Sequence, residues 1–281
     1  MHNKNINISA SDINKFAYCP YQWYYERFYG RRKILEVLSK HKEKRIKPKK
    51  NVGDVNKNNF SRGNEFHRNF RKRYLLARRK KIFLFLIVLI VILSGLFFGR
   101  EKFAILAGVI LIIKIVFVRN IKKMNINLPF WPWILIYSDE RNKNQKDTFT
   151  SKLLFDKKNK LSGKPDLIYK NIFTKNIMPI ELKSGKIGTQ KKPRIGDLFQ
   201  VIAYFIILEN CLKKKPSYGY LIYSDYMFKI PNKRALRKKV LNALRNMRLI
   251  LNNGCTSDFI PYEKNTQICQ NCICRDSVCK L

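Results

Sequence analysis

Two short apolar segments with charged residues at fixed positions constrain the fold of this chain most strongly. The first, residues 166–169, begins with the carboxylate of Asp166, and the second holds Glu181 and Lys183 on either side of Leu182. Side chains alternate between the two faces of a β-strand, so Glu181 and Lys183 share one face while Leu182 points into a core. If the two segments pair as neighbouring strands, Asp166 meets Glu181 and Lys183 at one point of the sheet.

These three side chains have a recognisable chemistry. Two carboxylates at one point can hold a hard divalent cation through oxygen. A lysine beside them can orient a water and stabilise the charge that develops on a phosphate. Charged residues are also common at solvated strand ends, so the three residues alone leave a purely structural interpretation open.

The same stretch resembles a known family. Pro165-Asp166 followed by Glu181-Leu182-Lys183 resembles the motif of the PD-(D/E)xK nucleases, and in particular of their RecB-like branch. The resemblance implies an α/β protein of the α+β restriction-endonuclease-like type, with a mixed central sheet flanked by helices. It also implies that Asp166 and Glu181 bind Mg²⁺ or Mn²⁺, with the Leu182 carbonyl as a further ligand. Lys183 would then position the attacking water.

Two further pairs of residues, each four positions apart, resemble motifs of the same family. Gly63 and His67 open a predicted helix and resemble the Gly-x-x-x-His element, in which the histidine supplies a nitrogen ligand to the metal. On a second predicted helix, residues 196–212, Gln200 and Tyr204 lie four apart and therefore on one face. This pair resembles the Gln-x-x-x-Tyr motif, which implies a contact with the DNA backbone. Taken alone, a helical histidine is more often structural, and a glutamine–tyrosine pair occurs in many helices.

Cysteines gather at the C-terminal end of the chain. A Cys-x-x-Cys pair followed by further cysteines indicates metal or cluster ligation, and the spacing fits both a four-sulfur zinc site and a [4Fe–4S] cluster. The stretch that begins at Ser9 resembles the opening of the CRISPR-associated iron–sulfur exonuclease family. That resemblance implies a [4Fe–4S] cluster that joins the two ends of the domain and is held by Cys19, Cys269, Cys272 and Cys279. Cys274 is an additional thiol, which leaves the choice of the fourth ligand open.

The N-terminal stretch predicts a capped helix. Ser9 and Asp12 have the spacing of a capping box, and Ile13, Phe16 and Ala17 form an apolar stripe. A proline at position 20 is expected to end or kink this helix. The aromatic residues that follow are expected to pack the core, with stacking on bases as the alternative.

Residues 82–98 and 103–118 are two apolar runs joined by a short polar connector. Each is just long enough to span a thin hydrocarbon core. Two buried core helices are the alternative, but nothing else in the chain is apolar enough to surround helices that are hydrophobic on every face. Basic residues flank both runs on the same side, which places the soluble part in the cytoplasm. We therefore expect a membrane hairpin inserted into the soluble domain.

The rest of the chain predicts further strands and one basic helix. Residues 151–155 and 161–169 are expected to form a hairpin that leads into Asp166, and residues 218–223 another core strand. Residues 233–251 predict an amphipathic basic helix with Leu236, Val240, Leu241, Leu244, Met247 and Leu251 on its buried side. The chain thus divides into an N-terminal helical part, a hairpin insertion, a nuclease core and a cysteine-rich tail, at residues 1–75, 76–124, 125–254 and 255–281.

The charge points to an anionic partner. The chain has 58 Lys and Arg against 19 Asp and Glu, a net charge of +39, and nucleic acid and anionic lipid are the polyanions that such a protein meets. Three histidines are too few for a histidine-rich metal protein. The first apolar run begins far from Met1, so we expect no secretory signal, and a reducing compartment favours cysteine ligation over disulfides.

These observations predict a membrane-anchored, divalent-metal-dependent deoxyribonuclease. The resemblance further implies an exonuclease acting on single-stranded DNA from the 5′ end, in CRISPR adaptation, antiviral defence or DNA processing, with proteins of those systems as partners. One alternative is a catalytically silent membrane-bound adaptor that binds nucleic acid. A zinc-binding membrane protein is the other alternative.

Overall fold

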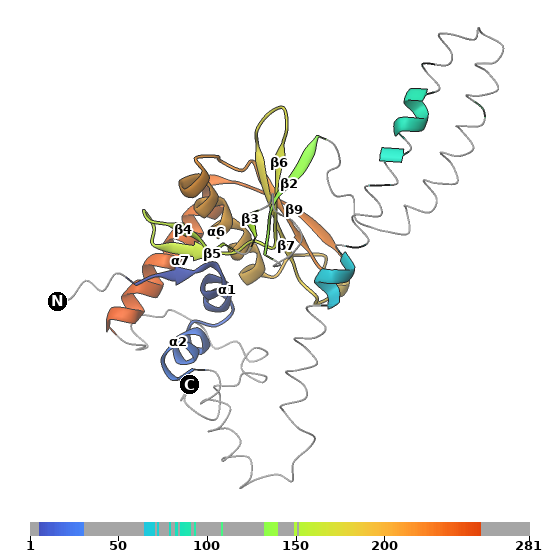
Figure 1. Ribbon diagram of the computed structural model, residues 1–281. Coiled ribbons are helices and arrows are strands. Elements are labelled where there is room, and N and C mark those ends of the chain that lie inside the picture. Colours follow the sequence, from blue (N-terminus) through green and yellow to red (C-terminus); the bar gives the residue numbers. More distant parts are fainter. Residues whose placement is uncertain are drawn as a thin grey trace.

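The computed structural model shows a mixed α/β protein with two sheets and a central helix between layers (Figure 1). It describes residues 6–30, 65–70, 132–139, 149–150 and 152–253, together with residues 72, 79, 82, 83, 85–90, 93 and 108. This architecture agrees with the predicted class of a mixed sheet flanked by helices.

The larger sheet has six strands in the order β3-β2-β6-β7-β8-β9. Their bounds are β2 Trp133–Ser138, β3 Phe149–Thr150, β6 Leu167–Asn171, β7 Ile177–Leu182, β8 Tyr218–Ile222 and β9 Met227–Pro231. The sheet is mixed, since β2 and β3 are parallel, β7 and β8 are parallel, and the other neighbours are antiparallel.

The pairing of the two charged segments is confirmed. β6 and β7 are antiparallel neighbours, with Leu167 opposite Ile180. Ile180 and Leu182 pack in an apolar cluster on one face of the sheet, while Glu181 points to the opposite face. The alternation that the sequence predicted is therefore present at the strand end.

The predicted hairpin is present, since β4 and β5 pair antiparallel, but its second strand is shorter than predicted. Residues 161–169 do not form one strand, because β5 (Leu161–Gly163) belongs to a separate sheet with β1 (Ile8–Ser9) and β4 (Leu154–Asp156) in the order β1-β5-β4. The break falls at Pro165, whose nitrogen has no hydrogen to donate to a strand ladder. The break turns the chain from one sheet to the other just before Asp166.

Helix α6 (Ile195–Leu212) links β7 to β8 and lies between the six-stranded sheet and the outer helices (Figure 1). Its side chains from Val201 to Leu208 are almost completely buried. Among the described residues, only this helix is long and apolar enough to cross a membrane, and 61% of it is buried inside the fold. Its apolar character therefore reflects its central position in the fold. Its length and composition are only weak evidence for a membrane span.

Helix α1 (Ala10–Tyr18) packs against α6, and α2 (Pro20–Tyr29) packs against α1 and α7. The predicted capping box is present: Asp12 N donates to Ser9 Oγ at 3.0 Å, and Ser9 N donates to Asp12 Oδ2 at 2.9 Å. Pro20 ends α1 and becomes the first residue of α2, a position where its missing N–H costs nothing. Ala10, rather than Ala17, completes the buried stripe of α1.

Helix α7 (Arg234–Asn253) is amphipathic, as predicted, and completes the layer outside α6. Its buried side chains are Val240, Ala243, Leu244, Met247 and Ile250. Leu241 was predicted on this side but is 39% exposed. Ala243 and Ile250 take part in the core instead, because the helical period of 3.6 residues rotates Leu241 away from it.

A short helical segment covers part of the other face of the sheet. Residues 65–70 are helical, and Phe70 is buried against Tyr169, Met178 and Ile180. This packing holds the segment over the ends of β6 and β7. It thereby brings His67 to the edge of the sheet where Asp166 lies.

Two predicted regions fall largely outside the described residues. The tail at 255–281, with Cys269, Cys272, Cys274 and Cys279, lies wholly outside them, as does most of the hairpin at 76–124. The described residues between 82 and 93 are helical. Trp133 lies in β2 with its ring 6.2 Å from that of Tyr218.

The contact of α1 with α6 gives a first prediction. A Cβ built on Gly196 would lie 2.5 Å from the backbone oxygen of Asn14, so Gly196→Ala must push the two helices apart. We expect a loss of unfolding free energy of about 1–3 kcal/mol, measured by urea denaturation. Gly185→Ala is the control, because its Cβ would meet only the flexible guanidinium of Arg194. Equal stability of the two variants would contradict the packing described.

Candidate active site

Asp166 is held at the point where the chain enters β6. Its Oδ2 accepts a hydrogen bond of 2.6 Å from Leu182 N, across the strand pair. Its carbonyl oxygen accepts from Asp139 N at 3.1 Å, which ties it to the end of β2. Two neighbouring strands thus fix the backbone and the carboxylate of Asp166.

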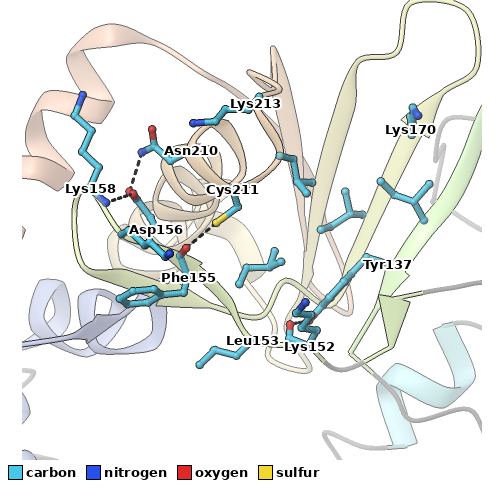
Figure 2. Close-up of a pocket in the computed structure, with 15 residues that line it drawn as sticks. Tyr137, Lys152, Leu153, Phe155, Asp156, Lys158, Lys170, Asn210, Cys211 and Lys213 are labelled. Atoms are coloured by element: carbon cyan, nitrogen blue, oxygen red, sulfur yellow. Dashed lines mark hydrogen bonds between the residues drawn. The ribbon is translucent and has the colours of Figure 1, made fainter.

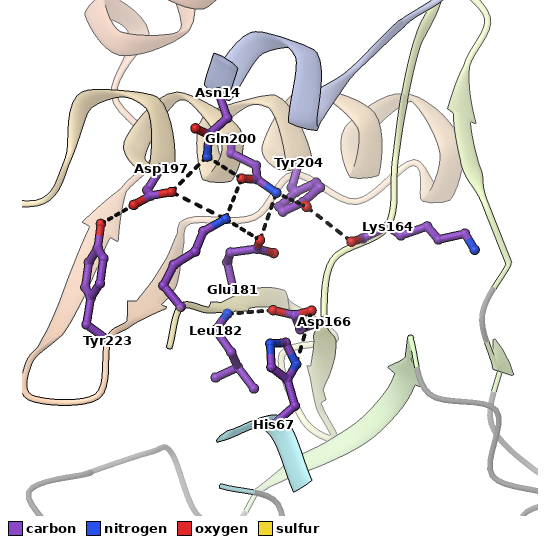
Figure 3. A network of polar contacts seen from close by, with 11 residues as sticks. Asn14, His67, Lys164, Asp166, Glu181, Leu182, Asp197, Gln200, Tyr204 and Tyr223 are labelled. Carbon is purple, nitrogen blue, oxygen red and sulfur yellow. Dashed lines mark hydrogen bonds and ion pairs between the residues drawn. The ribbon is translucent and has the colours of Figure 1, made fainter. Parts of the chain in front are cut away.

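Glu181 lies on the face of the sheet that α6 covers, where Gln200 of that helix bonds it (Figure 3). Lys183 Nζ lies 3.0 Å from Glu181 Oε1. In Figure 3, Asp166 lies between Glu181 and His67. The predicted convergence of Asp166, Glu181 and Lys183 at one strand end is therefore what the structure shows.

Gln200 connects these groups to helix α6. Its Oε1 accepts hydrogen bonds from Lys183 Nζ at 2.8 Å and from Asn14 Nδ2 at 2.7 Å. Its Nε2 donates to Glu181 Oε1 and to Tyr204 Oη, both at 2.8 Å. Each donor and each lone pair of the amide has a partner, so the orientation of the amide is determined by its surroundings.

The structure corrects the predicted role of Gln200 and Tyr204. They lie on one face of α6, as expected, but their exposed fractions are only 5% and 1%. Tyr204 Oη donates to the carbonyl oxygen of Lys164 at 3.1 Å, just before Asp166. Both side chains therefore face the charged groups and position them, and a direct contact with a DNA backbone does not fit their burial.

Three polar residues that the sequence analysis did not predict complete the network: Asn14, Asp197 and Tyr223. Asp197 Oδ1 lies 3.3 Å from Lys183 Nζ and accepts from Asn14 Nδ2 at 2.8 Å. Asp197 Oδ2 accepts from Tyr223 Oη at 2.6 Å. An acidic residue in the first turn of a helix is ordinary, and Asn14 is distant in sequence, so no local pattern distinguishes them.

His67 lies near Asp166 but is not hydrogen-bonded to it. Its Nδ1 lies 3.7 Å from Asp166 Oδ1, beyond hydrogen-bond distance, and its side chain is 32% exposed. It approaches from residues 65–70, on the side of Asp166 away from Glu181 (Figure 3). From this position His67 would reach a cation bound by Asp166.

Burial makes the two carboxylates hard to ionise together. Burial raises the pKa of Asp166 to about 7, although Leu182 N and Lys183 act in the opposite direction. Burial and the nearby Asp166 raise the pKa of Glu181 to about 8. Burial opposes the charge on Lys183, but Glu181 and Asp197 outweigh it and raise its pKa. The site therefore favours an additional positive charge beside the two carboxylates.

The donor set fits a hard divalent cation. Glu181 Oε2 is buried and has no hydrogen-bond partner among the described residues. A buried carboxylate oxygen without a partner is costly in free energy, and a cation bound there would satisfy it. Within the described part of the chain, no group of three or more His, Cys, Asp or Glu side chains is already gathered as a metal cage. Binding would thus require Glu181 Oε2 and Asp166 to turn toward a shared ion.

Cys19, the predicted N-terminal cluster ligand, lies at the junction of α1 and α2. Its side chain is buried and its Sγ accepts a 3.4 Å hydrogen bond from Gln22 N. Its three predicted partners are outside the described residues. The structure therefore fixes the position of Cys19 and leaves the cluster as a prediction.

Comparisons with known proteins add little to this geometry. No protein-family model matches the chain, and no curated protein matches it. Among solved structures, one described as the crystal structure of SSO0001 aligns with a TM-score of 0.37 at 14% identity, over the whole of this chain and 88% of its own. A likeness of this size carries no argument about fold or function.

The raised pKa values predict how stability depends on pH. The unfolded carboxylates titrate near pH 4, whereas Glu181 titrates at about 8 and Asp166 at about 7 in the folded protein. Their contribution to stability is therefore complete below pH 4 and is lost as the pH rises through 7 and 8. The melting temperature of the metal-free protein should therefore fall as the pH rises from about 4 to about 8. Glu181→Gln should make this fall smaller.

A divalent cation should stabilise the protein more at high pH than at low pH, because it binds the ionised carboxylates. We expect the increase in melting temperature on adding Mn²⁺ to be larger at pH 8.5 than at pH 6. An increase that is equal at both values, or larger at pH 6, would contradict the assignment of Asp166 and Glu181 as ligands.

The hydrogen bonds of Gln200 give a separate prediction. Gln200→Leu keeps the volume but removes four hydrogen bonds, one of them to the charged Lys183, and should cost about 2–3 kcal/mol of unfolding free energy. Tyr204→Phe removes two neutral hydrogen bonds and should cost about 1 kcal/mol. Urea denaturation measures both. A Gln200→Leu variant as stable as the parent would show that the network is not formed.

Proposed function

We propose that this chain is a divalent-metal-dependent nuclease of the PD-(D/E)xK type that hydrolyses phosphodiester bonds in DNA. One observation supports this most strongly. Asp166 and Glu181 come from the ends of two adjacent strands, and Lys183 lies 3.0 Å from Glu181 on the same face. A metal site beside a fixed lysine is what metal-assisted attack of water on a phosphate requires.

Each residue then has a definite role. Asp166 and Glu181 would hold Mg²⁺ or Mn²⁺, with His67 and the Leu182 carbonyl as further ligands. When bound, the ion supplies Lewis-acid activation of the phosphate and a more acidic water. Lys183 keeps its proton, because Glu181 and Asp197 favour its charged form, and it orients the water or stabilises the charge that develops on the phosphate.

Helix α6 preorganises these groups. Gln200 bonds Lys183 and Glu181 at the same time, and Tyr204 bonds Gln200 and the backbone before Asp166. Held in this way, the lysine and the carboxylate need little rearrangement when substrate arrives. Gln200 and Tyr204 are therefore positioning residues.

The charge supports a nucleic acid as substrate. A net charge of +39 attracts a polyanion over long distances at low salt. DNA as the substrate, single-strand preference, exonuclease action from the 5′ end and a role in CRISPR adaptation or antiviral defence are the parts of the proposal that rest on the family resemblance of the sequence.

A membrane anchor is part of the same proposal. The described residues between 82 and 93 are helical and include large apolar side chains with exposed fractions from 41% to 62%: Ile82, Phe83, Phe85, Leu86, Leu89, Ile90 and Leu93. So many exposed apolar side chains on one helical segment are costly in water and are typical of contact with lipid or with another protein. This supports a membrane contact at this segment, while the two-helix form and the cytoplasmic side rest on the two apolar runs and their basic flanks in the sequence.

A [4Fe–4S] cluster completes the proposal. Cys19 is buried between two helices of the N-terminal layer, which is where a ligand from the N-terminal part would hold the tail. Zinc at the same cysteines is the alternative that the spacing leaves open. Visible absorbance of the anaerobically purified protein distinguishes the two.

Substitution at the lysine tests the catalytic role. Lys183→Ala should lower the rate of Mn²⁺-dependent cleavage of labelled single-stranded DNA by at least about 100-fold, and Asp166→Asn should have a similar effect. Binding of the strand without metal should change little. Lys186→Ala, three residues away and exposed, is the matched control and should keep full activity.

The same assay separates the enzyme from a non-catalytic adaptor. An adaptor would bind the strand and show no cleavage that depends on Asp166 or Lys183. Full activity of Lys183→Ala would remove the lysine from the mechanism.

A further inference from the structure

The Lys183 ammonium is surrounded by three acceptors. Its Nζ lies 2.8 Å from Gln200 Oε1, 3.0 Å from Glu181 Oε1 and 3.3 Å from Asp197 Oδ1. An ammonium has three N–H donors and no acceptor, so three acceptors at these distances occupy all of its donors. In this state Lys183 therefore has no donor left for a water or a phosphate.

Glu181 is the one of these three partners that is also a proposed metal ligand. Its Oε1 contacts both Lys183 and Gln200, while its buried Oε2 has no hydrogen-bond partner among the described residues. If the carboxylate turns toward an ion shared with Asp166, Oε1 moves as well, because both oxygens belong to one planar group. A cation beside Glu181 also repels the ammonium. The contact between Lys183 and Glu181 is therefore the one that metal binding weakens.

Asp197 and Gln200 hold Lys183 from helix α6. They are three residues apart and therefore lie on one face of the helix, and their exposed fractions are 7% and 5%. Asn14 Nδ2 donates to Asp197 Oδ1 at 2.8 Å and to Gln200 Oε1 at 2.7 Å, so one amide of α1 fixes both acceptors. Neither residue is a proposed metal ligand, and both can keep their places when Glu181 turns.

Asp197 differs from Gln200 in its charge. The side chain of Lys183 is only 24% exposed, and a largely buried ammonium without a carboxylate partner is costly in free energy. Asp197 supplies that partner, and its Oδ2 accepts a 2.6 Å hydrogen bond from Tyr223 Oη, which fixes the direction of the carboxylate. In Figure 3, Asp197 lies on the side of Glu181 away from Asp166. An ammonium held by Asp197 therefore stays apart from an ion bound by the other two carboxylates.

We propose that Asp197 is a positioning residue that keeps the Lys183 ammonium on helix α6 when Glu181 turns to the metal, and that this exchange frees one lysine donor for the attacking water or the phosphate. The inference rests on the proposed nuclease function, because that function supplies the ion toward which Glu181 turns. It adds an order of events to that function: Lys183 reaches the substrate only after Glu181 has changed its partner.

Crystal structures of the full chain with and without Mn²⁺ test the exchange in the unmodified protein and without substrate. The distance from Lys183 Nζ to Glu181 Oε1 is 3.0 Å without metal and should increase beyond contact distance when Mn²⁺ is bound. The contact from Nζ to Asp197 Oδ1 should remain. A lysine that stays on Glu181, or that leaves Asp197, in the presence of bound Mn²⁺ would overturn the inference.

Asp197→Asn tests the same exchange in solution, because it keeps the shape of the side chain and removes its charge. We expect kcat for Mn²⁺-dependent cleavage of single-stranded DNA to fall about 10- to 100-fold, which is the usual effect of a small displacement of a catalytic group. The KM for the strand should stay the same, since Asp197 is too buried to touch it. Tyr223→Phe removes only the hydrogen bond to Asp197 and should lower kcat by a smaller factor.

Asp156 supplies the matched control at the other end of α6 (Figure 2). Its carboxylate is also buried, with an exposed fraction of 1%, and it accepts hydrogen bonds from Asn210 Nδ2 of α6 and from Lys158 N. It forms no ion pair with any other residue that the structure describes. Asp156→Asn should therefore lower the melting temperature and keep the parent kcat at temperatures below the transition. The same pattern in Asp197→Asn would show a merely structural role and overturn the inference.

The outcomes also separate this inference from the proposed function. If the parent protein cleaves DNA but Lys183 stays on Glu181 with Mn²⁺ bound, or Asp197→Asn keeps the parent kcat, the inference fails and the nuclease stands. If Mn²⁺ moves Lys183 from Glu181 to Asp197 but the parent never cleaves, the exchange is present and the nuclease proposal fails. Absence of Mn²⁺ from Asp166 and Glu181 at saturating concentration would overturn both.

Discussion

Two carboxylates at neighbouring strand ends, that of Glu181 buried and that of Asp166 largely buried, are the constraint on which the rest of the site depends. Burial raises the pKa of Asp166 to about 7, and burial together with the nearby Asp166 raises the pKa of Glu181 to about 8. The fold keeps them together with Lys183, which offsets part of the negative charge, and with a backbone hydrogen bond from Leu182. Glu181 Oε2 still has no partner among the described residues, and this is where a cation would complete the site.

Helix α6 relates the local chemistry to the whole fold. It is buried on almost every side, so its position is fixed by the sheet on one side and by α1 and α7 on the other. Gln200 of this helix holds Lys183 and Glu181 in place through hydrogen bonds, and Tyr204 in turn bonds Gln200. Because Asn14 of α1 joins the same network, the packing of the N-terminal helices bears on the geometry of the site.

The sequence predicted the parts of this arrangement that depend on local patterns. Alternation along residues 180–183 placed Glu181 and Lys183 on one face, and the capping box at Ser9 placed the start of α1; both agree with the structure. Leu241 was placed on the wrong side of α7, since several phases of a helix fit the same apolar residues.

Contacts between distant segments could not be predicted in the same way. Asn14 and Asp197 meet across 183 residues, and nothing in their local sequence marks either of them. Burial of Gln200 and Tyr204 depends on the layer outside α6, which a motif on one helix does not reveal. This burial is the reason that both residues are assigned as positioning residues and not as contacts with DNA.

Diffraction from crystals soaked in Mn²⁺, recorded at a wavelength where manganese scatters anomalously, tests the central claim most directly. The account predicts an anomalous peak within coordination distance of a carboxylate oxygen of Asp166 and of Glu181, near Lys183, and its loss in Glu181→Gln. A peak that is absent at saturating Mn²⁺, or that lies away from both carboxylates, would contradict it.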